Sequence, residues 1–361
     1  MKHLVLFEDD PRFLESFLGR LRSNGGIKLH HFLPEGKFDP KDKHTVESLL
    51  YSWIRKEVPQ IPDMIVTDRD LSSIYEISIS TALVVQLGRQ LGVPVCLYAR
   101  NVRRNLREEA HMNRLRRWSD GFITLDGTQK PEELARSTLQ ILDGFSEIRA
   151  SYAKLNKPLP PATFISRLLN EPKLVDRLTL YITGDSNKLT DILSFTDYKK
   201  GKDPMAEIRR RIPIVLGYWL WESVLRYPGI LLEKIAAASY LNISESEFED
   251  PEVRAIFKST TYNGPFAGAK PTWYRHKLDE LISSGGVNNG NELVAKKLGR
   301  QIAKCMCSVD PKRTAGYFCI ITNRPVSLEC SRGGVAWIPS GADLARVSKP
   351  AFDELMPWLG I

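Results

Sequence analysis

The sequence lacks both a long apolar run and a leader. A helix that spans a membrane takes about 18 consecutive apolar residues, and the longest candidate here, residues 212–225, contains Glu222. The first residues, MKHLVLFEDD, have neither the length nor the cleavage pattern of a signal peptide. We therefore expect a cytoplasmic protein with no membrane partner.

Cysteines and catalytic motifs are scarce as well. The chain has only five cysteines, and without an export signal they predict free thiols or a metal site rather than disulfides. It has no Walker loop, no Gly-x-Ser-x-Gly elbow, no histidine-rich metal motif and no helix-turn-helix with a basic second helix. The missing catalytic motifs make an enzyme the less expected class, and the missing helix-turn-helix gives no support to a transcription factor.

Charge and length set further bounds. The net charge is +8 over 361 residues, an excess compatible with a nucleic-acid or acidic-protein partner. The length allows two or three domains. The pattern along the chain predicts an α/β domain at 1–145, a helix extension and proline-rich linker at 146–163, a mostly helical domain at 164–300, and a small β-rich, cysteine-containing segment at 301–361.

The first domain alternates between short apolar runs and helical patterns. Five runs have the length and composition of strands: 3–8, 27–32, 63–71, 93–99 and 121–125. The first helix begins at Asp10-Pro11, a capping residue followed by a proline suited to a first turn. This alternation predicts a doubly wound, five-stranded parallel sheet of the flavodoxin-like class.

Acidic residues follow two of these strands. Glu8 and Asp9 end the first strand, and Asp68 and Asp70 end the third. Because ligands of such sheets bind beyond the carboxyl ends of the strands, we expect these side chains to meet in one pocket. Clustered carboxylates repel one another unless a cation holds them, and oxygen ligands favour Mg²⁺. The alternative is that Asp10 caps a helix and the other acids are solvated strand ends.

The stretches LVLFEDDPRFLESFLGRL, PDMIVTDRDL and VPVCLYA resemble, in that order and spacing, the receiver domain of bacterial response regulators. The resemblance covers roughly residues 1–145. It implies that Glu8 and Asp9 hold Mg²⁺ and that Asp68 accepts a phosphoryl group from a histidine kinase. It also implies that Asp70 offers its backbone carbonyl to the metal.

Two other positions depart from the receiver pattern. The small hydroxyl residue that ends the fourth strand in that family is replaced by Ala99, or by Tyr98 if the register slips. The lysine that ends the fifth strand is missing, and Lys130-Pro131 follows five residues after Leu125. The domain is therefore either a working phosphoacceptor or a degenerate receiver that acts as a protein-docking module.

A second resemblance gives a different function. A glutamate after the first strand and an Asp-x-Asp after the third, here Glu8 and Asp68-Arg69-Asp70, also resemble the acid pattern of Toprim nucleases and primases. That resemblance implies a Mg²⁺-dependent nuclease. Toprim chains usually place glycine after the glutamate, where this chain has Asp9.

A basic segment at 100–117 has seven arginines and two glutamates. It is either a solvated helix face or a surface that binds an acidic protein or a phosphate backbone. The residues predicted to bind are Arg103, Arg104, Arg107, Arg114, Arg116 and Arg117. In receivers this face commonly mediates partner contacts and homodimers. A second basic face at Lys296, Lys297 and Arg300 is a further candidate for nucleic acid.

Four cysteines gather in the last sixty residues: Cys305, Cys307, Cys319 and Cys330. Thiolates in two hairpin-like arms are suitable ligands for tetrahedral Zn²⁺. The alternative is that they are small buried hydrophobic residues. The chain as a whole is thus expected to be a signalling protein, in which a receiver-like domain regulates a C-terminal interaction domain. Its expected partner is a histidine kinase or another signalling protein.

Overall fold

The computed structural model describes residues 1–8, 10–22, 26–32, 46–68, 71, 79–98, 122–125, 130–182 and 204–359. These residues form two compact units. The first contains the described residues up to 158 together with 204–218, and the second contains 159–182 and 219–359. None of the described helices is both long enough and apolar enough to cross a membrane.

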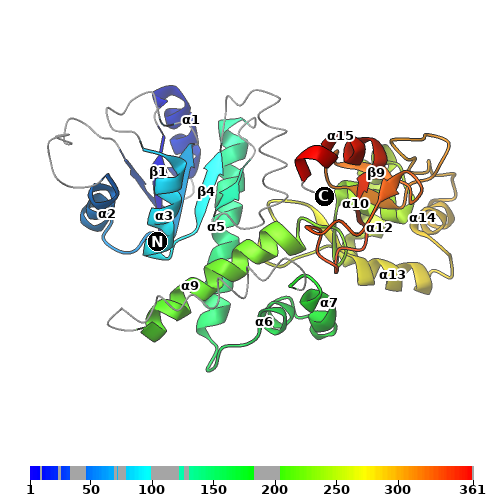
Figure 1. Ribbon diagram of the computed structural model, residues 1–361. Helices are drawn as coiled ribbons and strands as arrows, with labels where there is room; N and C mark the ends of the chain where they lie inside the picture. The colour runs from blue at the N-terminus through cyan, green and yellow to red at the C-terminus, as the bar shows by residue number, and fades with distance from the viewer. Residues whose placement is uncertain are drawn as a thin grey trace. The chain divides into compact units, whose positions relative to one another are not determined.

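The first unit is built on a five-stranded sheet in which every strand pair is parallel, in the order β2-β1-β3-β4-β5 (Figure 1). This confirms the predicted five-stranded parallel sheet of the α/β class. The strands are β1 (Lys2–Phe7), β2 (Ile27–His31), β3 (Met64–Asp68), β4 (Val95–Tyr98) and β5 (Ile123–Thr124).

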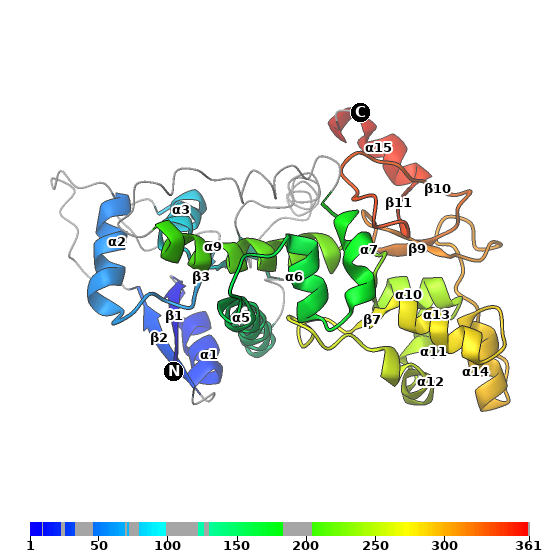
Figure 2. The ribbon, with the colours of Figure 1, turned by 90° about the horizontal axis from the view of Figure 1, so that it is seen from below.

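Helices cover both faces of this sheet (Figure 2). One face is covered by α1 (Pro11–Arg22) and α5 (Pro131–Ala153), and the other by α2 (Val46–Glu57) and α3 (Thr81–Leu91). Because the central strands are buried on both sides, their sequences are continuous apolar runs rather than alternating ones. All five residues of β3 are buried.

Capping residues set several helix ends in this unit. The Asp10 carboxylate accepts the backbone N–H of Phe13 at 3.3 Å, as the Asp10-Pro11 pair predicts. Ser80 accepts the N–H of Leu83 at the start of α3, and Gly92 ends that helix with φ 63°. A backbone position with positive φ favours glycine, because glycine has no Cβ that would clash with the backbone there.

A helix distant in sequence, α9 (Pro204–Trp219), belongs largely to this first unit. Gly217 lies so close to α5 that a Cβ there would come 2.3 Å from the ring of Phe145. The hydroxyl of Tyr218 accepts the backbone N–H of Val95 at 2.8 Å. These contacts fasten α9 to α5 and to the start of β4.

The second unit is mainly helical in its first part. Its helices are α6 (Pro161–Leu168), η1 (Pro172–Leu174), α7 (Val175–Thr179), η3 (Leu220–Val224), α10 (Lys234–Leu241), α11 (Glu245–Glu249), α12 (Pro251–Ile256), η4 (Lys258–Thr260), α13 (Arg275–Ser284) and α14 (Gly290–Leu298). A two-stranded antiparallel ribbon joins β6 (Leu231–Glu233) to β7 (Thr272–Tyr274). Four large aromatic side chains are buried in this unit: Trp219, Trp221, Trp273 and Tyr274.

The second unit ends in a small sheet of order β10-β11-β8-β9, followed by α15 (Lys349–Leu359). The strands are β8 (Tyr317–Cys319), β9 (Arg324–Val326), β10 (Ser331–Arg332) and β11 (Ala345–Ser348). Helix α10 packs against β8 and β9, and Ser239 of α10 donates to the Tyr317 carbonyl at 2.8 Å.

Candidate functional site at the carboxyl edge of the parallel sheet

The strand register aligns three polar residues at one edge of the sheet. Phe7 pairs with Thr67, and Asp68 pairs with Tyr98, so Glu8 comes level with Asp68 on the neighbouring strand. Parallel partners point to the same side of a sheet, and Glu8, Asp68 and Tyr98 therefore share one face. The structure thus brings Glu8 and Asp68 to the same edge.

Helix α1 covers this face. The centroid of the Tyr98 ring lies 5.6 Å from that of Phe13 and 6.3 Å from that of Phe17, both in α1. Deeper under the same face, Cys96 Sγ lies 3.5 Å from Met64 Sδ. The three polar residues therefore lie at the rim of an apolar layer.

Glu8 is buried, with 1% of its surface exposed, and both of its carboxylate oxygens accept hydrogen bonds from the chain itself. Oε1 accepts the backbone N–H of Asp10 at 2.8 Å, and Oε2 accepts the hydroxyl of Tyr98. Burial of a carboxylate is costly unless hydrogen bonds replace its water. These two donors stabilise Glu8 in its buried position.

His31, at the end of β2, holds the backbone of Glu8 in place. Its Nε2 donates to the Glu8 carbonyl oxygen at 2.9 Å. Burial lowers the pKa of His31, and the hydrogen bond to Glu8 opposes that shift only in part. A neutral ring with its proton on Nε2 satisfies this geometry.

Hydrogen bonds from the chain already engage both carboxylate oxygens of Glu8. Mg²⁺ takes oxygens at about 2.0–2.1 Å and keeps several waters, so a ligating carboxylate needs an open side. Among the residues that the structure describes, no three His, Cys, Asp or Glu side chains are arranged to hold a metal ion. Asp9 and Asp70 lie outside these residues, and the predicted Mg²⁺ site stays a prediction.

Asp68 is also buried, with 4% of its surface exposed. Thr67 Oγ1 donates to the Asp68 carbonyl oxygen at 2.9 Å and holds the end of β3 in place. A phosphoacceptor carboxylate must be reached by the phosphorus of its donor. A residue that is 4% exposed presents little surface to such a donor, and the phosphoacceptor role of Asp68 stays a prediction.

The structure locates two of the positions at which the sequence departs from the receiver pattern. Tyr98, the last residue of β4, pairs with Asp68, whereas Ala99 lies outside the described residues. Lys130 is exposed and precedes Pro131 at the first turn of α5.

The role of Tyr98 as a partner of Glu8 was missed by sequence reasoning. The available signal was a tyrosine at the end of an otherwise apolar strand, because a buried Tyr hydroxyl usually finds a hydrogen-bond partner.

The predicted basic segment lies outside the described part of the chain. This applies to Arg103, Arg104, Arg107, Arg114, Arg116 and Arg117. The second basic face is largely engaged within the protein. Lys296 Nζ donates to the Gly285 carbonyl at 2.9 Å, and Arg300 forms ion pairs with Glu247 at 2.7 Å and Asp250 at 3.0 Å. These contacts reduce the positive charge that this face offers to a phosphate backbone.

Three of the four C-terminal cysteines lie in one small cluster. Cys307 and Cys319 are almost fully buried, and Cys330 packs against them. Cys319 Sγ accepts the backbone N–H of Thr322 at 3.5 Å and that of Ser348 at 3.2 Å. The cluster is thus lined by donors as well as by apolar side chains.

The thiols of Cys305 and Cys307 differ in their pKa. Burial, followed by the charge of Glu245, raises the pKa of Cys305 to about 12. Burial also favours the neutral thiol at Cys307, but backbone N–H groups, led by those of Asp310 and Ser327, donate to its sulfur and lower its pKa. The thiolate, which is the form that binds metals, therefore forms more readily at Cys307 than at Cys305. The predicted four-cysteine Zn²⁺ site stays a prediction.

No protein-family model matches this sequence, and no curated protein is significantly similar to it. The likeness to receiver domains therefore remains a resemblance carried by short stretches of the chain.

Proposed function

We propose that the chain is a signal-transduction protein in which the first unit is a degenerate receiver. In this proposal the first unit docks with a signalling protein and regulates the C-terminal unit, without phosphoryl transfer to Asp68. The observation that supports this proposal is that both carboxylate oxygens of Glu8 accept hydrogen bonds from the chain itself. The donors are the backbone N–H of Asp10 and the hydroxyl of Tyr98.

The alignment of strands supports a receiver-like origin for this edge. Glu8 and Asp68 end neighbouring parallel strands, as the acids of a receiver would. The Tyr98 hydroxyl donates to Glu8 Oε2, and Glu8 is one of the two acids that the receiver resemblance assigns to the cation. A hydrogen bond from a neutral hydroxyl stabilises one buried carboxylate, but it supplies no positive charge to offset a phosphoryl group.

The decisive experiment is phosphoryl labelling of the full chain. The protein is incubated with acetyl phosphate and Mg²⁺ and then analysed by intact-mass and peptide mass spectrometry, with Asp68→Asn as the control variant. We expect no phosphoryl adduct on either protein. A phosphoryl adduct on the wild-type chain that disappears in Asp68→Asn would replace the docking proposal with a working phosphoacceptor.

Regulation of the second unit is tested separately by amide hydrogen exchange. Glu8→Gln changes the charge at the carboxyl edge without changing the shape of the side chain. We expect altered exchange in peptides from 219–359 when the first unit regulates the second. Exchange that changes only in peptides from the first unit would contradict the regulatory part of the proposal.

A further inference from the structure

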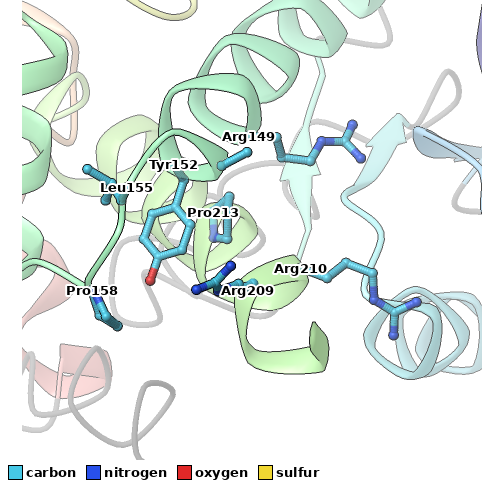
Figure 3. Close-up of a pocket in the computed structure, with 8 residues that line it drawn as sticks. Arg149, Tyr152, Leu155, Pro158, Arg209, Arg210 and Pro213 are labelled. Carbon is cyan, nitrogen blue, oxygen red and sulfur yellow. The ribbon is translucent and has the colours of Figure 1, made fainter. Parts of the chain in front are cut away.

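A cavity of about 310 Å³ lies between the C-terminal part of α5 and the middle of α9 (Figure 3). Both helices belong to the first unit. Its volume is at the lower end of the range for small-molecule pockets, about 300–1,000 Å³. The lining residues are Arg149, Tyr152, Ala153, Leu155, Pro158, Arg209, Arg210 and Pro213.

Much of the cavity wall is apolar and fixed in place. Tyr152 is buried, with 4% of the residue exposed, and its ring faces the cavity with Pro213 of α9 and Leu155 beyond the end of α5 (Figure 3). One turn after Pro213, the close contact of Gly217 with Phe145 holds the two helices together. A preformed wall of this kind favours a flat apolar ligand, since binding then requires little ordering of the protein.

Two of the three arginines that line the cavity contact other parts of the first unit. Arg149 donates to the Asp63 carbonyl oxygen at 2.8 Å and lies 3.5 Å from the Asp63 carboxylate. The guanidinium of Arg210 lies against Gly92 at the end of α3: a Cβ at Gly92 would come 2.9 Å from Arg210 Nε. Both side chains point away from the Tyr152 ring (Figure 3). Of the three arginines, Arg209 is the one whose guanidinium lies beside the Tyr152 ring (Figure 3).

Arg209 differs from Arg149 and Arg210 in its exposure and its contacts. It is exposed and forms no ion pair with any residue that the structure describes. Its charge is close enough to the Tyr152 hydroxyl to oppose the upward shift that burial imposes on the pKa of that group. An accessible guanidinium next to a phenolic hydroxyl and an apolar wall is a recognition site for an anionic group attached to an apolar body.

We propose that this cavity binds a small organic anion with a flat apolar body. The body packs against the Tyr152 ring and Pro213, the anionic group pairs with Arg209, and the Tyr152 hydroxyl donates to the same group. This site is distinct from the carboxyl edge, since Asp63, which pairs with Arg149, precedes β3 and Asp68 ends it. The proposal is independent of whether Asp68 accepts a phosphoryl group.

The test uses 2-naphthoate as the probe and the full chain as the protein, with binding measured by saturation-transfer NMR and calorimetry. Arg209→Gln removes the charge, and Arg136→Gln, an exposed arginine of α5 outside the cavity, is its matched control. Ala153→Phe fills the cavity from an exposed position. The uncharged analogue 2-naphthalenemethanol reports the apolar contribution, and inorganic phosphate reports the charge alone.

We expect naphthoate to bind more tightly than naphthalenemethanol. Arg209→Gln should weaken naphthoate about tenfold and naphthalenemethanol less than twofold, since a hydrogen bond to a charged group is lost only for the anion. Arg136→Gln should change neither, and Ala153→Phe should abolish both. Absence of naphthoate binding at millimolar concentration, or equal loss in Arg209→Gln and Arg136→Gln, would overturn the proposal. So would naphthoate binding that survives Ala153→Phe.

Discussion

The hydrogen bond between Tyr98 and Glu8 can be tested by removing a single oxygen atom. Tyr98→Phe deletes the hydroxyl that donates to Glu8 Oε2 and keeps the ring that packs near Phe13 and Phe17. Glu8 is 1% exposed, and the substitution removes the hydroxyl donor from one of its two carboxylate oxygens. A hydrogen bond to a charged group contributes about 1.5–3 kcal/mol. We therefore expect the variant to destabilise the carboxyl edge by about 2 kcal/mol.

Hydrogen exchange is the suitable assay, because a two-unit chain need not unfold in one step. Under conditions where exchange reports the opening equilibrium, 2 kcal/mol corresponds to about 30-fold faster exchange of the amides of β1, β3 and β4. Tyr51→Phe is the matched control, since the Tyr51 hydroxyl accepts from the exposed side chain of Arg55. Its effect should stay below about 0.5 kcal/mol.

A double-mutant cycle with Glu8→Gln isolates the charged part of the interaction. With a neutral amide at position 8, Tyr98→Phe should cost about 1 kcal/mol, the ordinary value for a neutral hydrogen bond. Exchange of the β1, β3 and β4 amides in Tyr98→Phe within twofold of the wild type would refute the reasoning. It would mean that Glu8 does not depend on the tyrosine hydroxyl.

Three further changes have expected outcomes. Arg226→Met should destabilise the second unit by about 3–5 kcal/mol in urea unfolding, because Glu222, 3% exposed and 2.9 Å from Arg226, loses its cation. Burial lowers the pKa of His30. The unfolded state therefore takes up the proton first as the pH falls, and stability present above pH 6.5 is lost as the pH falls through the folded pKa. His30→Gln should flatten that dependence. Gly217→Ala should cost about 1–3 kcal/mol in thermal unfolding, because its Cβ would meet Phe145 at 2.3 Å.

Each of these has a matched comparison. Lys234→Met breaks an exposed ion pair with Glu249 and should cost less than about 1 kcal/mol; an equal cost for Arg226→Met would contradict the argument from burial. Gly19→Ala adds a methyl group where nothing lies within 4 Å. It should therefore stabilise α1 by about 0.5–1 kcal/mol. An unchanged pH dependence in His30→Gln would show that this ring does not control stability.

The five-stranded sheet could be predicted because its signals are local. Parallel strands buried on both faces form continuous apolar runs, and the Asp10-Pro11 pair predicts the start of the first helix. The grouping of α9 with the first unit has no such signal. It depends on contacts such as that between Tyr218 and Val95, which are 123 residues apart. The helical spacing of α9 predicts a helix but does not say which surface the helix covers.

The common edge of Glu8 and Asp68 could also be predicted, since parallel strands end at a common edge. The partner of Glu8 could not. A shift of one residue in the register of β4 would turn Tyr98 to the opposite face of the sheet and place Ala99 level with Asp68. The sequence leaves both registers open, and only the pairing of Asp68 with Tyr98 decides between a small side chain and a phenol at this edge.

The two ends of β3 differ in what they offer to a ligand. At the carboxyl end Asp68 is buried beside Glu8, whose carboxylate oxygens accept hydrogen bonds from the chain itself. Before the amino end Asp63 anchors Arg149, whose helix lines an accessible cavity. Coupling between two sites requires an element with two alternative arrangements, and β3 is buried along its whole length in one register. Naphthoate should therefore bind Tyr98→Phe within twofold of its affinity for the wild type. A larger difference would mean that the strand transmits a change from one edge to the other, because such linkage is reciprocal.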